Sequence, residues 1–152
     1  MAWDLSGMTT RAPHQSCGFT RRLALALTAS AFFVPRAKAA PAAHQPFIDA
    51  AFEMKEAAVR AGDQAYGAVV VKDRRIIGFG PSRVVLRRDA TAHAEREAIR
   101  EAQARLGSQD LAGCLLYSSS RPCSNCEAVA AKAKIATMYY GRDATDAGAP
   151  RG

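Results

Sequence analysis

Apolar residues recur at helical spacing over residues 46–61, and Gly62 closes this pattern, as glycines at helix ends commonly do. Two short runs follow at 66–71 and 75–80, both rich in β-branched and other apolar residues. The polar residues between the two runs favour a tight turn. This part of the pattern therefore predicts a helix followed by an antiparallel hairpin.

Beyond the hairpin, helical and strand-like patterns alternate. A loop at 81–90 leads to a predicted helix over 92–106, where Ala, Glu, Arg, Leu and Gln predominate. The sequence then predicts a strand at 115–117, a helix over 123–134 and a strand over 135–141, with an irregular tail. Strands that are separated by helices indicate parallel crossover connections. The expected fold class is α/β, a three-layer α/β/α sandwich with a mixed sheet.

Composition and charge suggest one folded domain behind a distinct leader. The chain has 152 residues, of which 49% are hydrophobic, and this suits a single domain with a sizeable core. The formal net charge is +7, but residues 1–39 hold five basic residues and one acidic residue. The remaining +3 over residues 40–152 is an ordinary surface balance, and we therefore expect no nucleic-acid partner.

Residues 1–39 resemble an export signal at the end of a disordered leader. The Arg21-Arg22 pair precedes a short apolar run at 24–34, and Ala37-Lys38-Ala39 is typical of a cleavage site. The arginine pair suggests the twin-arginine route and a periplasmic location. The apolar run is too short for a stable membrane span. The alternatives are a mitochondrial-type presequence, or a spurious upstream extension on a cytoplasmic protein. Met8 is a second candidate for the true start of the chain.

Two short motifs bring together the side chains of a catalytic zinc site. A His-x-Glu motif supplies His93, and a Pro-Cys-x-x-Cys motif supplies Cys123 and Cys126. Catalytic zinc keeps three protein ligands and one open position, so Glu95 is left free to move protons. A Cys-x-x-Cys pair alone could instead be a redox pair, and a structural four-ligand site would need Cys114 as well.

Local helix signals support this arrangement. Thr91 is a plausible N-cap, which would place His93 and Glu95 in the first turn of a helix. Pro122 stands where a second helix would begin, so the two cysteines that follow it would lie on one face of that helix. Two positive helix ends would then point at one metal ion and favour thiolate over thiol.

The combined motif resembles the cytidine and deoxycytidylate deaminase superfamily, particularly small bacterial nucleoside, guanine and tRNA-adenosine deaminases. The resemblance spans about residues 46–148 and the predicted order of elements. It implies that the His and the two Cys bind Zn²⁺ and that Glu95 shuttles a proton between water, a ring nitrogen and the leaving amine. It also implies that the N–H of Ala94 lies beside the reacting centre and that Tyr66 forms a wall near the base.

Four departures from the family pattern affect the expected substrate contacts. Ser82 takes the place of an Asn that contacts substrate in many relatives, and Arg121 stands where many have Glu. Ser124-Asn125 replaces a common Pro-Met between the cysteines. The chain also ends soon after the last predicted strand, whereas many relatives continue with elements that close the pocket.

The resemblance implies a zinc-dependent hydrolase that deaminates a free nucleobase or nucleoside and releases ammonia. The alternatives are a tRNA adenosine deaminase, which would need a basic face and stacking aromatics, and a non-catalytic zinc-stabilised module. A homo-oligomer is expected because the sheet edge beside the last predicted strand would need cover.

Overall fold

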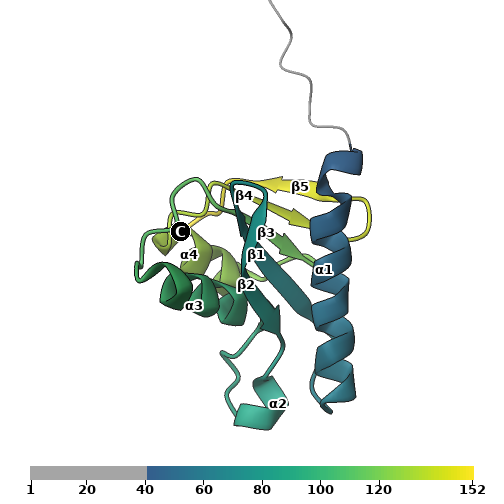
Figure 1. Ribbon diagram of the computed structural model, residues 1–152. Helices are drawn as coiled ribbons and strands as arrows, with labels where there is room; N and C mark the ends of the chain where they lie inside the picture. The colour runs from purple at the N-terminus through teal and green to yellow at the C-terminus, as the bar shows by residue number, and fades with distance from the viewer. Residues whose placement is uncertain (1–40) are drawn as a thin grey trace, which may run out of the picture. The chain divides into compact units, whose positions relative to one another are not determined.

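The computed structural model describes residues 41–152. The predicted leader and its boundary after residue 39 lie outside the described residues. The described part of the chain forms four helices and five strands (Figure 1): α1 (Pro41–Arg60), β1 (Gly67–Lys72), β2 (Arg75–Pro81), α2 (Val84–Arg87), α3 (Ala94–Leu106), β3 (Leu115–Ser118), α4 (Ser124–Lys132), β4 (Thr137–Tyr140) and β5 (Thr145–Gly148). Among these residues, no helix is both long and apolar enough to cross a membrane.

The strands form one mixed sheet in the order β2-β1-β3-β4-β5. β1 pairs antiparallel with both β2 and β3, and β5 pairs antiparallel with β4. β3 and β4 run parallel, and α4 connects them. The predicted hairpin, the crossover through α4 and the mixed α/β fold are therefore confirmed.

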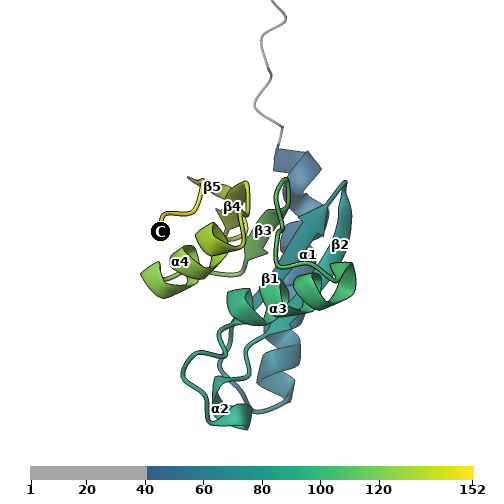
Figure 2. The ribbon, with the colours of Figure 1, turned by 90° about the vertical axis from the view of Figure 1, so that its left-hand side faces the viewer.

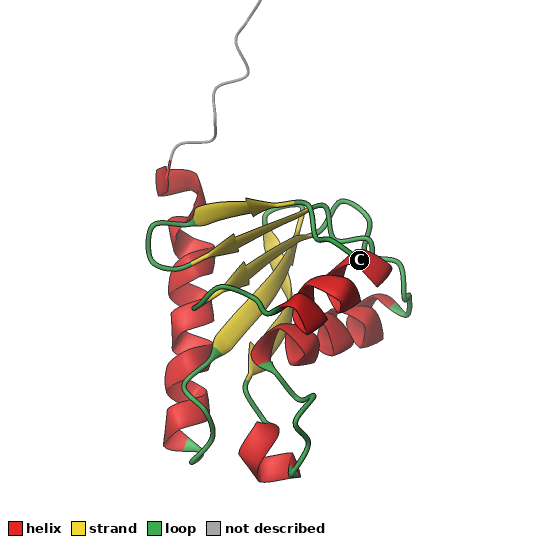
Figure 3. Ribbon diagram, turned by 180° about the vertical axis from the view of Figure 1, so that it is seen from behind, coloured by secondary structure: helices red, strands yellow, loops and turns green. Residues whose placement is uncertain are grey.

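Helices cover both faces of this sheet. α1 lies on one side of the strands, and α3 and α4 lie on the other (Figures 2 and 3). The buried residues of β1 divide accordingly, because successive side chains of a strand point to opposite faces. Ala68 and Val70 belong to the core cluster under α3 and α4, whereas Val69 and Val71 belong to the cluster under α1. This explains why β1 is an uninterrupted apolar run rather than an alternating one.

Two glycines of β2 allow the strand to lie directly against the backbone of α3. A Cβ atom at Gly78 would lie 2.2 Å from the carbonyl oxygen of Ala98, and one at Gly80 would lie 2.0 Å from that of Ala94. Glycine permits such close backbone approach because it has no side chain. The contact holds the first turn of α3 at the end of β2, and this places the residues of the His-x-Glu motif.

Replacing Gly80 by Ala should destabilise the fold, because the new methyl group would overlap the backbone of α3. We expect a loss of roughly 1–3 kcal/mol in the free energy of unfolding, the usual cost of overpacking. Urea unfolding would measure it, with Gly152→Ala as the control, because a Cβ there would lie 3.6 Å from the Cβ of Ala131, an ordinary contact. An unchanged unfolding midpoint for Gly80→Ala would show that α3 does not rest on this strand.

The tail after β4 was predicted to be irregular, and this is wrong. Residues Thr145–Gly148 form β5 and pair with β4, so β4 is not an open edge. The segment gives little signal in the sequence, since Ala147 is its one side chain packed against the core. Its pairing comes from backbone hydrogen bonds that β4 offers. Self-association stays a prediction. The reason given for it, an unpaired edge at the fourth strand, does not hold, because β5 pairs with β4.

The structure differs from the sequence prediction at two other elements, the start of α1 and the loop at 81–90. α1 begins at Pro41 rather than near residue 46, and Nδ1 of His44 lies 2.7 Å from the hydroxyl of Tyr117, which anchors the added turn to β3. The loop predicted at 81–90 contains the short helix α2.

Candidate active site

The side chains of His93, Cys123 and Cys126 converge on one point. Nδ1 of His93 lies 3.5 Å from Sγ of Cys126 and 3.7 Å from Sγ of Cys123. The ligand atoms of all three residues lie within 4.8 Å of one another. A tetrahedral zinc ion with ordinary Zn–N and Zn–S bonds holds its nitrogen and sulfur ligands about 3.6 Å apart. The spacing and the donor set of one imidazole and two sulfurs therefore fit zinc.

Two helix starts position these ligands. His93 is the N-cap of α3 and Cys123 is the N-cap of α4, both with an extended backbone, and Cys126 follows in the first turn of α4. Neither side chain caps its own helix. The predictions that Thr91 is an N-cap and that Pro122 opens a helix are therefore each wrong by two residues. The extended N-caps turn their side chains toward each other instead.

The carboxylate of Glu95 lies against this cluster. Glu95 is only 6% exposed, its Oε1 accepts a hydrogen bond from Oγ of Ser118 at 3.1 Å, and its Oε2 lies 3.5 Å from Sγ of Cys126. The carboxylate is thus fixed beside the ligands. Ser118 was not predicted as a site residue, and it is the first of three consecutive serines that follow the strand predicted at 115–117. A small polar residue at the end of a buried strand was the one available signal.

The electrostatics of the cluster favour a bound cation. Burial raises the pKa of the Cys126 thiol, and the neighbouring Glu95 carboxylate raises it further. A divalent cation reverses this effect, because a coordinating thiol is deprotonated outright. The positive ends of α3 and α4 act in the same direction.

A pocket of about 510 Å³ opens beside the ligands. It is lined by Gln64, Tyr66, His93, Ala94, Glu95, Ser120, Arg121 and Cys123. The volume lies within the range of small-molecule sites. The pocket brings together Glu95, two of the predicted metal ligands, His93 and Cys123, and two predicted substrate contacts, Tyr66 and Ala94. Tyr66 is 47% exposed, so its ring is available to a ligand.

Ser82 is not among the residues that line this pocket, although its backbone N–H donates a 3.0 Å hydrogen bond to the carbonyl oxygen of Tyr66, which does line it. Ser82 is 1% exposed, and its hydroxyl donates a 2.8 Å hydrogen bond to Oδ1 of Asp63. Oδ2 of Asp63 accepts hydrogen bonds from the backbone N–H groups of Val85 and Leu86. Although burial opposes the effect, these bonds hold the pKa of Asp63 below its usual value. Asp63 therefore ties the α1–β1 turn to the loop that leads into the metal ligands.

A family model described as the cytidine and deoxycytidylate deaminase zinc-binding region matches residues 41–142, which include the ligands and Glu95. The chain belongs to this deaminase family.

Two kinds of deaminase are similar to this chain. Guanine deaminase of Bacillus subtilis is 39% identical over 105 residues, which are 68% of this chain and 67% of the relative. Its solved structure matches with a TM-score of 0.62 over 64% of this chain and 63% of that one. A tRNA-specific adenosine deaminase of Agrobacterium fabrum is 36% identical over 103 residues, 68% of either chain. A solved tRNA:A34 deaminase, 36% identical, matches with a TM-score of 0.61 over 63% of this chain and 70% of that one.

These relatives are hydrolytic deaminases, and the chain is an enzyme of that type. The identities of the guanine and tRNA relatives are too similar to decide the substrate, and the chain spans about two thirds of their lengths.

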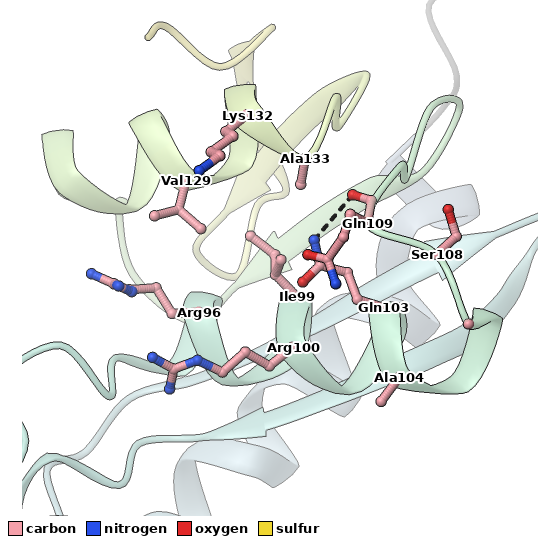
Figure 4. Close-up of a pocket in the computed structure, with 11 residues that line it drawn as sticks. Arg96, Ile99, Arg100, Gln103, Ala104, Ser108, Gln109, Val129, Lys132 and Ala133 are labelled. Atoms are coloured by element: carbon pink, nitrogen blue, oxygen red, sulfur yellow. Dashed lines mark hydrogen bonds between the residues drawn. The ribbon is translucent and has the colours of Figure 1, made fainter.

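A larger cavity of this deaminase domain lies away from the chemistry. The groove between α3 and α4 measures about 910 Å³ (Figure 4). Arg96 and Arg100 project from α3 on one side, and Lys132 comes from α4. Its lining contains no carboxylate and none of the predicted metal ligands. The smaller pocket beside Glu95 is therefore the candidate active site.

Proposed function

We propose that this enzyme hydrolyses the exocyclic amino group of a free purine or pyrimidine base or of its nucleoside. Water replaces the amine, so that one C–N bond breaks, one C–O bond forms and ammonia leaves. The observation that supports this reaction is the buried carboxylate of Glu95, which lies beside three metal-binding side chains and on the wall of a pocket. A purely structural metal site would not need this carboxylate.

We infer that His93, Cys123 and Cys126 hold Zn²⁺. When bound, zinc lowers the pKa of a coordinated water from about 16 to about 7. The chain itself supplies the proton transfer. Glu95 would take a proton from the attacking water, pass it to a ring nitrogen and then help protonate the leaving amine. The hydrogen bond from Ser118 leaves Oε2 of Glu95 as the oxygen turned toward the cluster.

The remaining pocket residues would hold the ring. The exposed face of Tyr66 can stack on a flat base, as aromatic side chains commonly do. The backbone N–H of Ala94 lies in the first turn of α3 and would face the reacting carbon. Ser82 would act through Asp63, because its hydroxyl is already bonded there.

A second candidate is deamination of adenosine in tRNA, which the similarity to the Agrobacterium enzyme and to the tRNA:A34 deaminase favours. An ammonia-release screen separates the two. It would compare guanine, guanosine, cytosine, cytidine, adenosine and a tRNA anticodon hairpin. We expect release from at least one free base or nucleoside, and none from the same substrate with Glu95→Gln. Release from the hairpin alone would replace the first proposal by the second.

We also propose that residues 1–39 are a twin-arginine signal removed after Ala39, which would make the mature enzyme periplasmic. The support is the Arg21-Arg22 pair, which is followed by an apolar run and then by small residues typical of a cleavage site. Export in the folded state would also protect metal-bound thiolates from oxidation, because metal binding and folding are coupled.

Mass spectrometry of protein from fractionated native cells tests this location. The expected result is a chain that starts at Ala40 in the periplasm, and its loss when both arginines are replaced by lysine. An intact N-terminus in the cytoplasmic fraction, unchanged by the double replacement, would rule the signal out.

A further inference from the structure

Arg121 is a charged residue on the pocket wall that the proposed reaction does not use. It lies in the connection between β3 and α4, and its side chain is exposed. It is two positions from Cys123 in the sequence, so their Cα atoms lie at most about 7 Å apart. A cation therefore stands at the mouth of the pocket, close to the metal ligands.

Within residues 41–152, no carboxylate pairs with Arg121. The arginines around α3 behave differently, since Arg83, Arg87 and Arg100 share the buried carboxylate of Glu97. Arg121 also finds no neutralising charge in the pocket. The one carboxylate in the pocket lining belongs to Glu95, which is buried and bonded to Ser118. The guanidinium is therefore free to bind an anion.

The orientation of a bound substrate places one specific group near this cation. The amine that leaves must face the metal ligands and Glu95 at the inner end of the pocket. The ribose of a nucleoside would then project toward the mouth, where Arg121 and Tyr66 are exposed. A phosphate on that ribose matches the planar fork of an arginine, which can bind two of its oxygens at once. We propose that Arg121 makes a nucleoside 5′-monophosphate the preferred substrate, an inference that rests on the proposed deaminase activity.

The lining of the pocket favours a single phosphate over a polynucleotide. Polynucleotide binding draws on several cations that neutralise successive phosphates. Arg121 is the one arginine or lysine among the described residues that line the pocket. Of the arginines near the first turns of α3, Arg83, Arg87 and Arg100 are paired with Glu97. Arg96 and Lys132 lie in the α3–α4 groove instead of the pocket. One free arginine at the mouth fits one phosphate.

The test compares kcat and KM for three pairs, guanosine and GMP, cytidine and CMP, and adenosine and AMP. The proteins are wild type, Arg121→Gln, Arg121→Glu and Arg75→Gln. The last removes the same charge from an exposed site at the far end of β2. Zinc content and circular dichroism would establish that all four proteins are folded alike.

We expect wild type to prefer one monophosphate to its nucleoside. Arg121→Gln should lower kcat/KM for that monophosphate by about ten- to a hundredfold, the range of a charge-assisted hydrogen bond. The loss should fall mainly on KM, since a contact at the mouth is made equally in the ground and transition states. Arg121→Glu should lose more, and Arg75→Gln should match wild type on both substrates. For Arg121→Gln, the fall in kcat/KM should be much larger on the monophosphate than on its nucleoside.

Failure of the inference on Arg121 and failure of the proposed deaminase activity would give different results. If the nucleosides are deaminated but their monophosphates are no better, or if Arg121→Gln treats both alike, the inference on Arg121 is wrong and the deaminase proposal stands. If an anticodon hairpin is preferred to every mononucleotide, the single-phosphate substrate is also wrong. If no base, nucleoside, nucleotide or hairpin releases ammonia, the proposed function itself fails.

Discussion

Replacing Glu95 by Gln is expected to abolish nearly all deamination while zinc remains bound and the fold is unchanged. The amide keeps the shape of the side chain and can still bond to Ser118, but it cannot accept and return a proton. A general acid–base group typically contributes on the order of 10²- to 10⁴-fold to the rate. Because Glu95 would act on both the water and the leaving amine, the loss in kcat should reach the upper end of this range or exceed it.

The measurement is kcat on the substrate identified by ammonia release, together with zinc content. Glu53→Gln on α1 is the matched control, because it makes the same chemical change at an exposed position on the other side of the sheet. Wild-type turnover in Glu95→Gln would contradict the proton-transfer role. Loss of zinc from that variant would show instead that Glu95 is a ligand.

Purified protein should contain close to one zinc ion per chain, and Cys123→Ala should lose it together with activity. The variant removes one of three ligands at an exposed position, so little core packing is lost with it. The proximity of Nδ1 of His93 to both sulfurs is the reason to expect a single shared ion. Metal analysis by mass spectrometry gives the stoichiometry, and thermal unfolding with and without a chelator gives the linked change in stability.

Cys114→Ala is the control for this experiment. Cys114 is buried and outside the ligand cluster, so its replacement should cost packing energy but no zinc. Full zinc content in Cys123→Ala would overturn the assignment. Zinc loss in Cys114→Ala would restore the four-ligand structural site as an explanation.

The sequence predicts much of this fold because its strong patterns are local. The apolar run of β1, the turn after it and the helix-forming composition of α3 each determine their own element. β5 could not be predicted in this way, because its residues have weak strand preferences and it exists through pairing with β4. The starts of α3 and α4 also differ from the predicted ones. Their N-caps are His93 and Cys123, whose side chains make no capping hydrogen bond, so the sequence gives no capping signal at these positions.

The cluster of predicted metal ligands was predictable for a different reason. His93, Glu95, Cys123 and Cys126 carry a specific chemistry at fixed spacing, and the structure brings them together. The bond between Ser118 and Glu95, and the one between Ser82 and Asp63, join residues that are 23 and 19 positions apart. Such pairs depend on how β3 lies under α3 and how the α1–β1 turn meets the next loop. No pattern of neighbouring residues reports that.

The placement of the ligands at two helix starts has a thermodynamic consequence. His93 and Cys123 are 30 positions apart, and an ion bound to both cross-links the chain around α3 and β3. By the relation used for disulfides, closing a loop of this length removes about 3–4 kcal/mol of conformational entropy from the unfolded chain. That amount is a large fraction of the net stability of a typical domain. Zinc would then stabilise the fold as well as take part in catalysis, and the supply of the metal would govern how much folded protein accumulates.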